Sequence, residues 1–93
     1  MSYRITEISF DPSEKDELFA YVDTQRDKIN AVNGLQLVHV IDIDEGQSEI
    51  IARYDSEESA VAATEKVQEI LAGMGQFMTA LPNRKGGPIT WEI

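Results

Sequence analysis

His39 is the only histidine in the chain, and histidine is the side chain that most readily accepts and donates protons near neutral pH. It lies in an apolar, β-branched stretch, on a strand face whose polar neighbours would form a small cluster with it: Glu7, Glu49 and Arg53. A catalytic histidine normally works with a nucleophile or a second acid–base group, and no such partner is identifiable here. Two interpretations therefore stand: His39 moves protons, or it is a structural histidine at a subunit interface.

Aromatic and methionine residues suggest a second kind of chemistry. Tyr54, Tyr21, Trp91 and Phe77 could line a pocket between sheet and helices for a flat apolar ligand, with Met74 and Met78 at its border. Aromatic residues at strand ends and on helix stripes also pack in ordinary cores. The same residues therefore fit either a ligand pocket or a filled core.

The segment 84–87, Arg-Lys-Gly-Gly, is the only basic, glycine-rich stretch. Arg84 could hold a carboxylate or phosphate, or cover the mouth of a cavity. The segment lacks the spacing of a phosphate-binding loop, which favours a solvated loop. With no cysteine, a single histidine and scattered carboxylates, neither a metal site nor a bound cofactor is expected.

Secondary-structure signals are clearest between Gly34 and Ser59. The segment 35–43 is rich in β-branched and aliphatic residues, Asp44-Glu45-Gly46 predicts a turn, and 48–54 resumes as a strand. Asp55 with Glu58 predicts a helix start. The sequence therefore predicts a β-hairpin that leads into a helix.

The remaining elements complete a β-α-β-β-α-β order. A strand is predicted over 3–10, then a helix from Pro12 to about Val32, capped by Asp11 and ended by Gly34. A second helix is predicted over 56–72, a loop over 82–88 and a last strand over 89–93. This order predicts one α+β domain, 1–93, with the ferredoxin-like fold: a four-stranded antiparallel sheet with two helices on one face.

The face of the sheet away from the helices would expose an apolar surface formed by Leu35, Leu37, Ile41, Ile5 and Ile51. Such a surface is too apolar to face water. A second copy of the chain would cover it, which predicts a homodimer through sheet faces.

The chain has 8 basic and 17 acidic residues, a net charge of −9. This acidic surface repels nucleic acid and anionic lipid. The start MSYRITEI lacks the features of a signal peptide, and no apolar run is long enough to span a bilayer. We therefore expect a cytoplasmic protein that binds neither nucleic acid nor membranes.

The strand after Gly34, the acidic turn and IARYDSEESA running into an Ala-rich helix resemble the dimeric α+β barrel superfamily. The closest resemblance is to its antibiotic-biosynthesis-monooxygenase-like branch. The superfamily includes cofactor-independent oxygenases of polyketide or quinol substrates and haem-degrading oxygenases. The haem-degrading members use Asn, Trp and His where this chain has Thr6, Tyr54 and about Thr64, so haem degradation is not expected.

The resemblance implies a small homodimeric monooxygenase of aromatic or polyketide-like molecules, without a bound metal. Tyr54, Trp91 and His39 would then position the substrate and move protons, while Thr6, Tyr21, Met74, Phe77, Met78 and Arg84 would contact it. Two alternatives remain: a non-catalytic dimeric module that binds an apolar ligand or a protein partner, and a fold whose pocket is filled by side chains.

Overall fold

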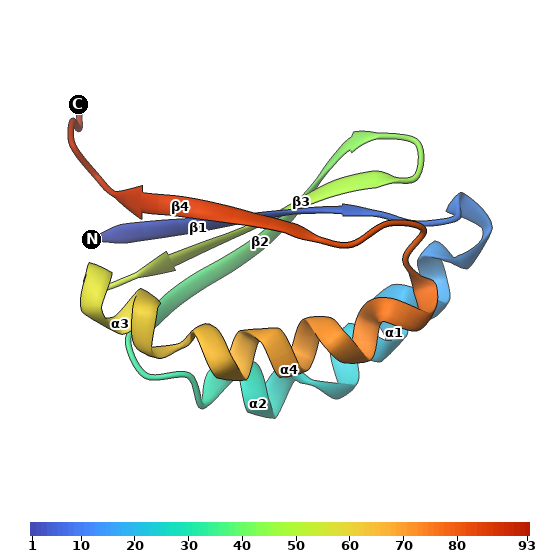
Figure 1. Ribbon diagram of the computed structural model, residues 1–93, viewed down its shortest axis with the longest axis horizontal. Helices are drawn as coiled ribbons and strands as arrows, with labels where there is room; N and C mark the ends of the chain where they lie inside the picture. The colour runs from blue at the N-terminus through green and yellow to red at the C-terminus, as the bar shows by residue number, and fades with distance from the viewer.

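The computed structural model describes all 93 residues and arranges them in two layers, a sheet above a layer of helices (Figure 1). The sheet contains β1 (Ser2–Ser9), β2 (Leu35–Asp44), β3 (Gln47–Tyr54) and β4 (Asn83–Pro88). The helices are α1 (Lys15–Thr24), α2 (Arg26–Asn30), α3 (Glu57–Ala62) and α4 (Thr64–Met74), with short 3-10 turns η1 (Pro12–Glu14) and η2 (Gly75–Phe77). The predicted ferredoxin-like β-α-β-β-α-β order is confirmed.

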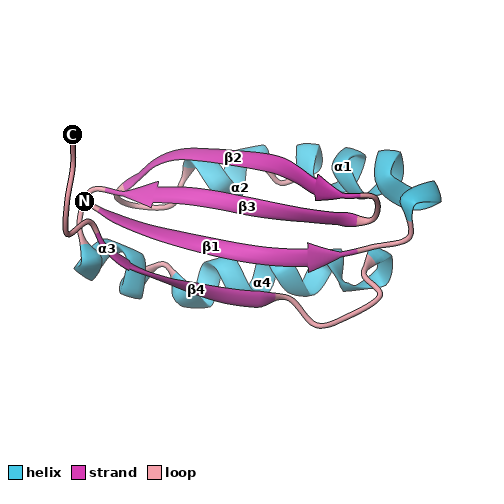
Figure 2. Ribbon diagram, turned by 90° about the horizontal axis from the view of Figure 1, so that it is seen from above, coloured by secondary structure: helices cyan, strands magenta, loops and turns pink.

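The strands lie in the order β2-β3-β1-β4, all antiparallel to their neighbours, and Figure 2 shows this order from above with the helices behind. The central strands are β3 and β1, and the edges are β2 and β4. None of the helices is long and apolar enough to cross a membrane.

The predicted turn residues occupy the expected conformations. Asp11 accepts a hydrogen bond from the backbone N–H of Ser13 at 2.9 Å and so caps η1. Gly34 and Gly46 have φ angles of +80° and +73°, the left-handed region that glycine enters without strain. Both connections into and within the β2–β3 hairpin therefore depend on glycine.

Each of the two predicted helices is interrupted once. The first divides at Gln25, whose N–H bonds Val22 O three residues back, so the hydrogen-bond pattern tightens locally. The second divides at Ala63 and begins one residue later than predicted. Its cap is Ser56, which accepts from the Ser59 N–H, rather than Asp55.

The last strand is Asn83–Pro88, so the predictions of a loop over 82–88 and a strand over 89–93 were wrong. The glycines mark a close approach rather than a loop: a Cβ at Gly86 would lie 2.0 Å from Tyr3 O and 2.9 Å from Arg4 Cα. Only glycine lets β4 come this close to β1. The apolar segment 89–93 lies beyond the sheet and extends away from it (Figure 1).

The apolar residues of the sheet lie on the predicted faces, except for Leu35. An irregularity between Leu35 and Leu37 lets Leu35 pair with Tyr54 and Leu37 with Arg53, which face opposite ways on β3. Leu35 therefore packs on the helix side, beside the cluster of Val32, Tyr54, Ala60 and Ala63. The opposite face is uncovered and keeps Leu37, Ile41, Ile5 and Ile51.

Candidate functional site

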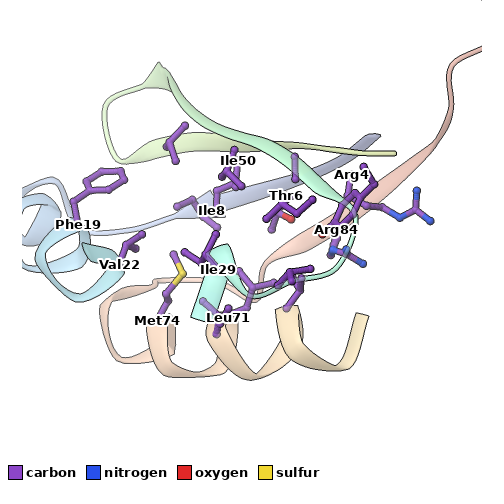
Figure 3. Close-up of a pocket in the computed structure, with 18 residues that line it drawn as sticks. Arg4, Thr6, Ile8, Phe19, Val22, Ile29, Ile50, Leu71, Met74 and Arg84 are labelled. Carbon is purple, nitrogen blue, oxygen red and sulfur yellow. The ribbon is translucent and has the colours of Figure 1, made fainter. Parts of the chain in front are cut away.

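A cavity of about 90 Å³ lies between the sheet and the helices. Eighteen residues line it, and fifteen of them are hydrophobic. Figure 3 shows these side chains converging from the sheet above and from the helices below. A concave, mostly apolar lining with a few polar groups is typical of sites that bind small molecules.

The sheet supplies the ceiling of the cavity in two rows of paired residues. One row runs Val40, Ile50, Thr6, Arg84 across all four strands, and the next runs Val38, Ala52, Arg4, Gly86. Paired residues of antiparallel strands project to the same face, so every residue of these rows faces the helices. The floor and walls come from the helices and their connections: Phe19, Val22, Ile29, Val32, Val67, Ile70, Leu71 and Met74.

The cavity adjoins an open cleft of about 380 Å³ between β2 and the helices α1 and α2. The two spaces share six lining residues, all hydrophobic: Phe19, Val22, Ile29, Leu35, Val38 and Val40. Val38 and Val40 face the cleft and are each 37% exposed, because β2 is an edge strand. The cleft therefore forms a mouth through which a small molecule can reach the cavity.

Arg4 lies at the polar end of the cavity but is fully engaged elsewhere. Its Nη1 and Nη2 each donate to a carboxylate oxygen of Glu57 at 2.9 Å, which ties β1 to the first turn of α3. The hydrogen bonds from Arg4 and then from Ser2 lower the pKa of the Glu57 carboxyl to about 2. In Figure 3 the guanidinium of Arg4 points away from the cavity. Its charge is balanced by Glu57.

Arg84 is the second arginine of the cavity lining, and it differs from Arg4. It forms none of the ion pairs of the structure, and its Nη2 atom is buried without a hydrogen-bond partner. No aspartate or glutamate lines the cavity. Arg84 is therefore the one charged residue of the lining without a charged partner.

Four of the residues singled out in the sequence line the cavity: Thr6, Tyr54, Met74 and Arg84. Thr6 and Tyr54 are buried and are the only hydroxyl-bearing residues among the eighteen. Tyr21, Phe77 and Met78 lie beside the cavity and pack against the core cluster that contains Ile8, Leu18 and Met74. The rings of Tyr21 and Phe77 are 6.1 Å apart and tilted, as in ordinary core packing.

His39 and Trp91 lie away from the cavity. His39 pairs with Ile51, which pairs with Ile5, so all three belong to the uncovered face of the sheet. Trp91 lies in the segment after β4 and is 76% exposed. The structure therefore does not bring His39, Tyr54 and Trp91 together within one subunit. The face of His39 carries the expected polar neighbours, with Glu7 directly opposite Glu49.

No group of three or more histidine, cysteine, aspartate or glutamate side chains could hold a metal ion. The polar groups of the cavity are two guanidinium groups, which do not bind metal ions, and two hydroxyl groups. The arrangement can hold an apolar molecule and place one polar group of it near Thr6 and Arg84.

Comparison with known proteins shows the fold. A candidate antibiotic biosynthesis monooxygenase from Nitrosomonas europaea superposes with a TM-score of 0.77 and 10% identity, over 98% of this chain and 100% of the other. Another from Bordetella bronchiseptica gives a TM-score of 0.77 and 14% identity, over 97% of each chain. The chain has the ferredoxin-like fold of these proteins.

A dimeric ferredoxin-like protein from an uncultured marine organism also superposes, with a TM-score of 0.75 and 13% identity, over 99% of this chain and 90% of the other. No protein-family model matches the chain, and no curated protein matches it in sequence. At these identities the structural comparisons establish the fold and leave the reaction to be argued from the site.

Several cavity residues were missing from the sequence-based prediction of the site, among them Phe19, Val38, Val40 and Ala52. The alternation of β2 and β3 places Val38, Val40 and Ala52 on the helix-facing side, so their face was predictable. Their role as cavity-lining residues was not predictable. Alternation shows which face a residue occupies, but it does not show whether the helices fill the space beneath that face.

Proposed function

We propose that this chain is a homodimer in which each cavity between sheet and helices binds a small apolar or aromatic molecule, and that it acts on this molecule as a monooxygenase of the antibiotic-biosynthesis type. The observation that carries the proposal is the apolar cavity with its open mouth at β2. The names of the structural neighbours support the reaction class.

The size of the cavity limits how a ligand can lie. An engineered cavity of about 150 Å³ binds benzene, and the inner space here is about 90 Å³. A ring can therefore enter only with part of its body in the adjoining cleft. The ligand would lie along the line from the Val38–Val40 wall to the Thr6–Arg84 end.

A cofactor-independent reaction of this class balances without an external reductant. A ring methylene of an anthrone-like substrate reacts with O₂ to give a ring carbonyl and one water, and both electron pairs come from the two C–H bonds of the substrate. The protein must bind the ring, keep water out and hold a proton during the transfer. Thr6 and Tyr54 would position the substrate, since they alone supply hydroxyl groups to the cavity.

The uncovered face of the sheet supports the homodimer. Ile5, Leu37, Ile41 and Ile51 form an apolar surface on this face, and Ile41 is 41% exposed in the single chain. A second copy of the chain has the same apolar surface. In a two-fold symmetric dimer the apolar surfaces of the two copies would cover each other. The dimeric structural neighbour with the same fold agrees with this arrangement. His39 would then lie between subunits.

Oxygen consumption tests the reaction. The purified protein is first screened by thermal shift against anthrones, quinols and fatty acids, since a ligand at 100 times its Kd adds about 2.7 kcal/mol of stability. Anthrones and quinols that stabilise the protein are then followed in an oxygen electrode. For an anthrone we expect one O₂ consumed per carbonyl formed, and slower turnover in Tyr54→Phe. Ligand binding without oxygen uptake would contradict the monooxygenase assignment.

One observation favours a second candidate, a binding module without turnover. No histidine, aspartate or glutamate lines the cavity, so the usual general bases are missing from it. A binding module needs only the cavity, its mouth and a polar group that orients the ligand. Saturable binding with no O₂ uptake would establish this candidate.

A further inference from the structure

Arg84 holds the only buried side-chain nitrogen or oxygen of the structure that lacks a hydrogen-bond partner, its Nη2 atom. A guanidinium is always charged in proteins and has five N–H donors but no acceptor. A buried charged donor without a partner is costly, because it has left water without gaining a replacement. Arg84 as a whole is half-buried, so this cost applies to Nη2, for which a carboxylate oxygen is a suitable acceptor.

No protein anion is available on the cavity side. Arg84 lies opposite Thr6 on the helix-facing side of the sheet, and Figure 3 shows its guanidinium directed from the sheet towards the helices. The other charged residue of the cavity, Arg4, is already held by both oxygens of Glu57. The cavity is thus apolar along most of its length, with one unpaired cation at its β4 end.

We propose that the ligand of this cavity is a small apolar molecule carrying one carboxylate, which pairs with the guanidinium of Arg84. The inference rests on the proposed ligand-binding function and names the class of ligand. The apolar body lies between Ile50 and Leu71 and extends towards the mouth beside Val38. Thr6, directly across from Arg84, supplies a hydroxyl group at the same end.

A carboxylate fits this site better than a phosphate. Phosphate sites gather several donors or cations, whereas this cavity offers one unpaired arginine amid fifteen hydrophobic residues. The chain has a net charge of −9, which repels anions at long range. The preference for a carboxylate must therefore come from local contacts at this end of the cavity, and we expect Arg84 to supply most of it.

The test compares octanoate with 1-octanol by isothermal titration calorimetry at pH 7.5. The two probes share an apolar chain and differ in charge. We expect octanoate to bind the full-length protein at least about tenfold more tightly, the size of a charge-assisted hydrogen bond. In Arg84→Gln and Arg84→Met the preference should disappear, because octanoate loses its charged partner and then binds no more tightly than 1-octanol. Circular dichroism confirms that each variant is folded.

Lys85→Gln is the matched control, because Lys85 neighbours Arg84 on β4, pairs with Ile5 and faces the opposite way. It removes the same charge and should keep the preference for octanoate. Equal affinities of the wild-type protein for the two probes, or a preference that survives in Arg84→Gln, would overturn this inference and leave the apolar site standing. Binding of neither probe would overturn the proposed ligand-binding function, and the inference with it.

Discussion

Thr6 and Arg84 lie directly opposite each other in the antiparallel pair of β1 and β4, and both line the cavity between the sheet and the helices. Their row continues through Ile50 to Val40 at the other edge of the sheet. The cavity therefore has a polar end at β4 and an apolar mouth at β2. A ligand with one polar group should therefore bind in one orientation, with that group at the β4 end.

Filling the cavity should stabilise the protein and weaken ligand binding. Ala52 is central in the ceiling, between Val38 and Arg4, and faces the empty space. We expect Ala52→Val to raise the free energy of unfolding by about 0.5–2 kcal/mol and to lower the affinity for octanoate at least about tenfold. Urea unfolding and calorimetry measure the two effects.

The control for cavity filling is Ala60→Val. Ala60 is fully buried in the cluster of Val32 and Tyr54 and does not line the cavity. The added methyl groups have no free space there, so we expect a loss of about 1–3 kcal/mol. A loss of the same size in Ala52→Val would show that the space beneath Ala52 is closed.

Dimerisation should depend on Ile51, at the centre of the uncovered face between Ile5 and His39. A lysine there places a charge in the apolar surface of both subunits, so Ile51→Lys should convert the dimer to monomer. Light scattering after gel filtration measures the mass. Val61→Lys is the control, because Val61 lies on α3, is 59% exposed and should leave the mass unchanged. A monomeric wild-type protein at micromolar concentration would contradict the proposed dimer.

His39 should matter for the dimer and not for the ligand. Its strand face points away from the cavity. We expect His39→Asn to raise the dimer dissociation constant several-fold while octanoate binding and any oxygen uptake by the dimer stay at wild-type levels. Analytical ultracentrifugation and calorimetry on the same sample separate the two effects. Loss of turnover in an intact dimer would assign His39 a catalytic role after all.

The Arg4–Glu57 pair should shape the acid stability of the protein. The pKa of Glu57 is lowered from 4.5 to about 2, first by the hydrogen bond from Arg4 and then by that from Ser2. Because the pKa is lower in the folded state, the stabilisation is complete above pH 4.5 and is lost as the pH falls towards 2. In Glu57→Gln the free energy of unfolding should therefore change less with pH between 4.5 and about 2 than it does in the wild-type protein.

Glu58→Gln is the control for this pH effect, since Glu58 is the next residue and takes part in no ion pair. It should leave the acid limb of the stability curve as in the wild-type protein. Urea unfolding at several pH values between about 2 and 6 measures the free energy of unfolding of the wild-type protein and both variants. Parallel curves for wild type and Glu57→Gln would mean that the ion pair does not persist in solution.

The sequence was sufficient to predict the fold, because local signals and patterning agreed along most of the chain. Gly34 and Gly46 marked the turns, and Ile5 and Ile51 lie on the predicted face of the sheet away from the helices. The last strand was misplaced because its residues do not resemble a strand. Gly86 is required by the approach of another strand, a tertiary constraint with no local signal.

The lining of the cavity was predictable in part. Thr6, Tyr54, Met74 and Arg84 were singled out by type and position, and they line one cavity. The unpaired state of Arg84 could not be predicted, since it depends on which acidic residues lie nearby in space. Arg4 has such a partner in Glu57, which is 53 residues away in the sequence. Sequence patterns do not report pairings over such separations.

The most direct test of the account is a titration of isoleucine-methyl-labelled protein with octanoate, followed by NMR. Ile8, Ile29, Ile50 and Ile70 line the cavity, whereas Ile5, Ile41 and Ile51 lie on the uncovered face. We predict saturable shifts of the first group with the second group unmoved. Shifts confined to the second group, or no saturable shift at all, would contradict a ligand site between sheet and helices.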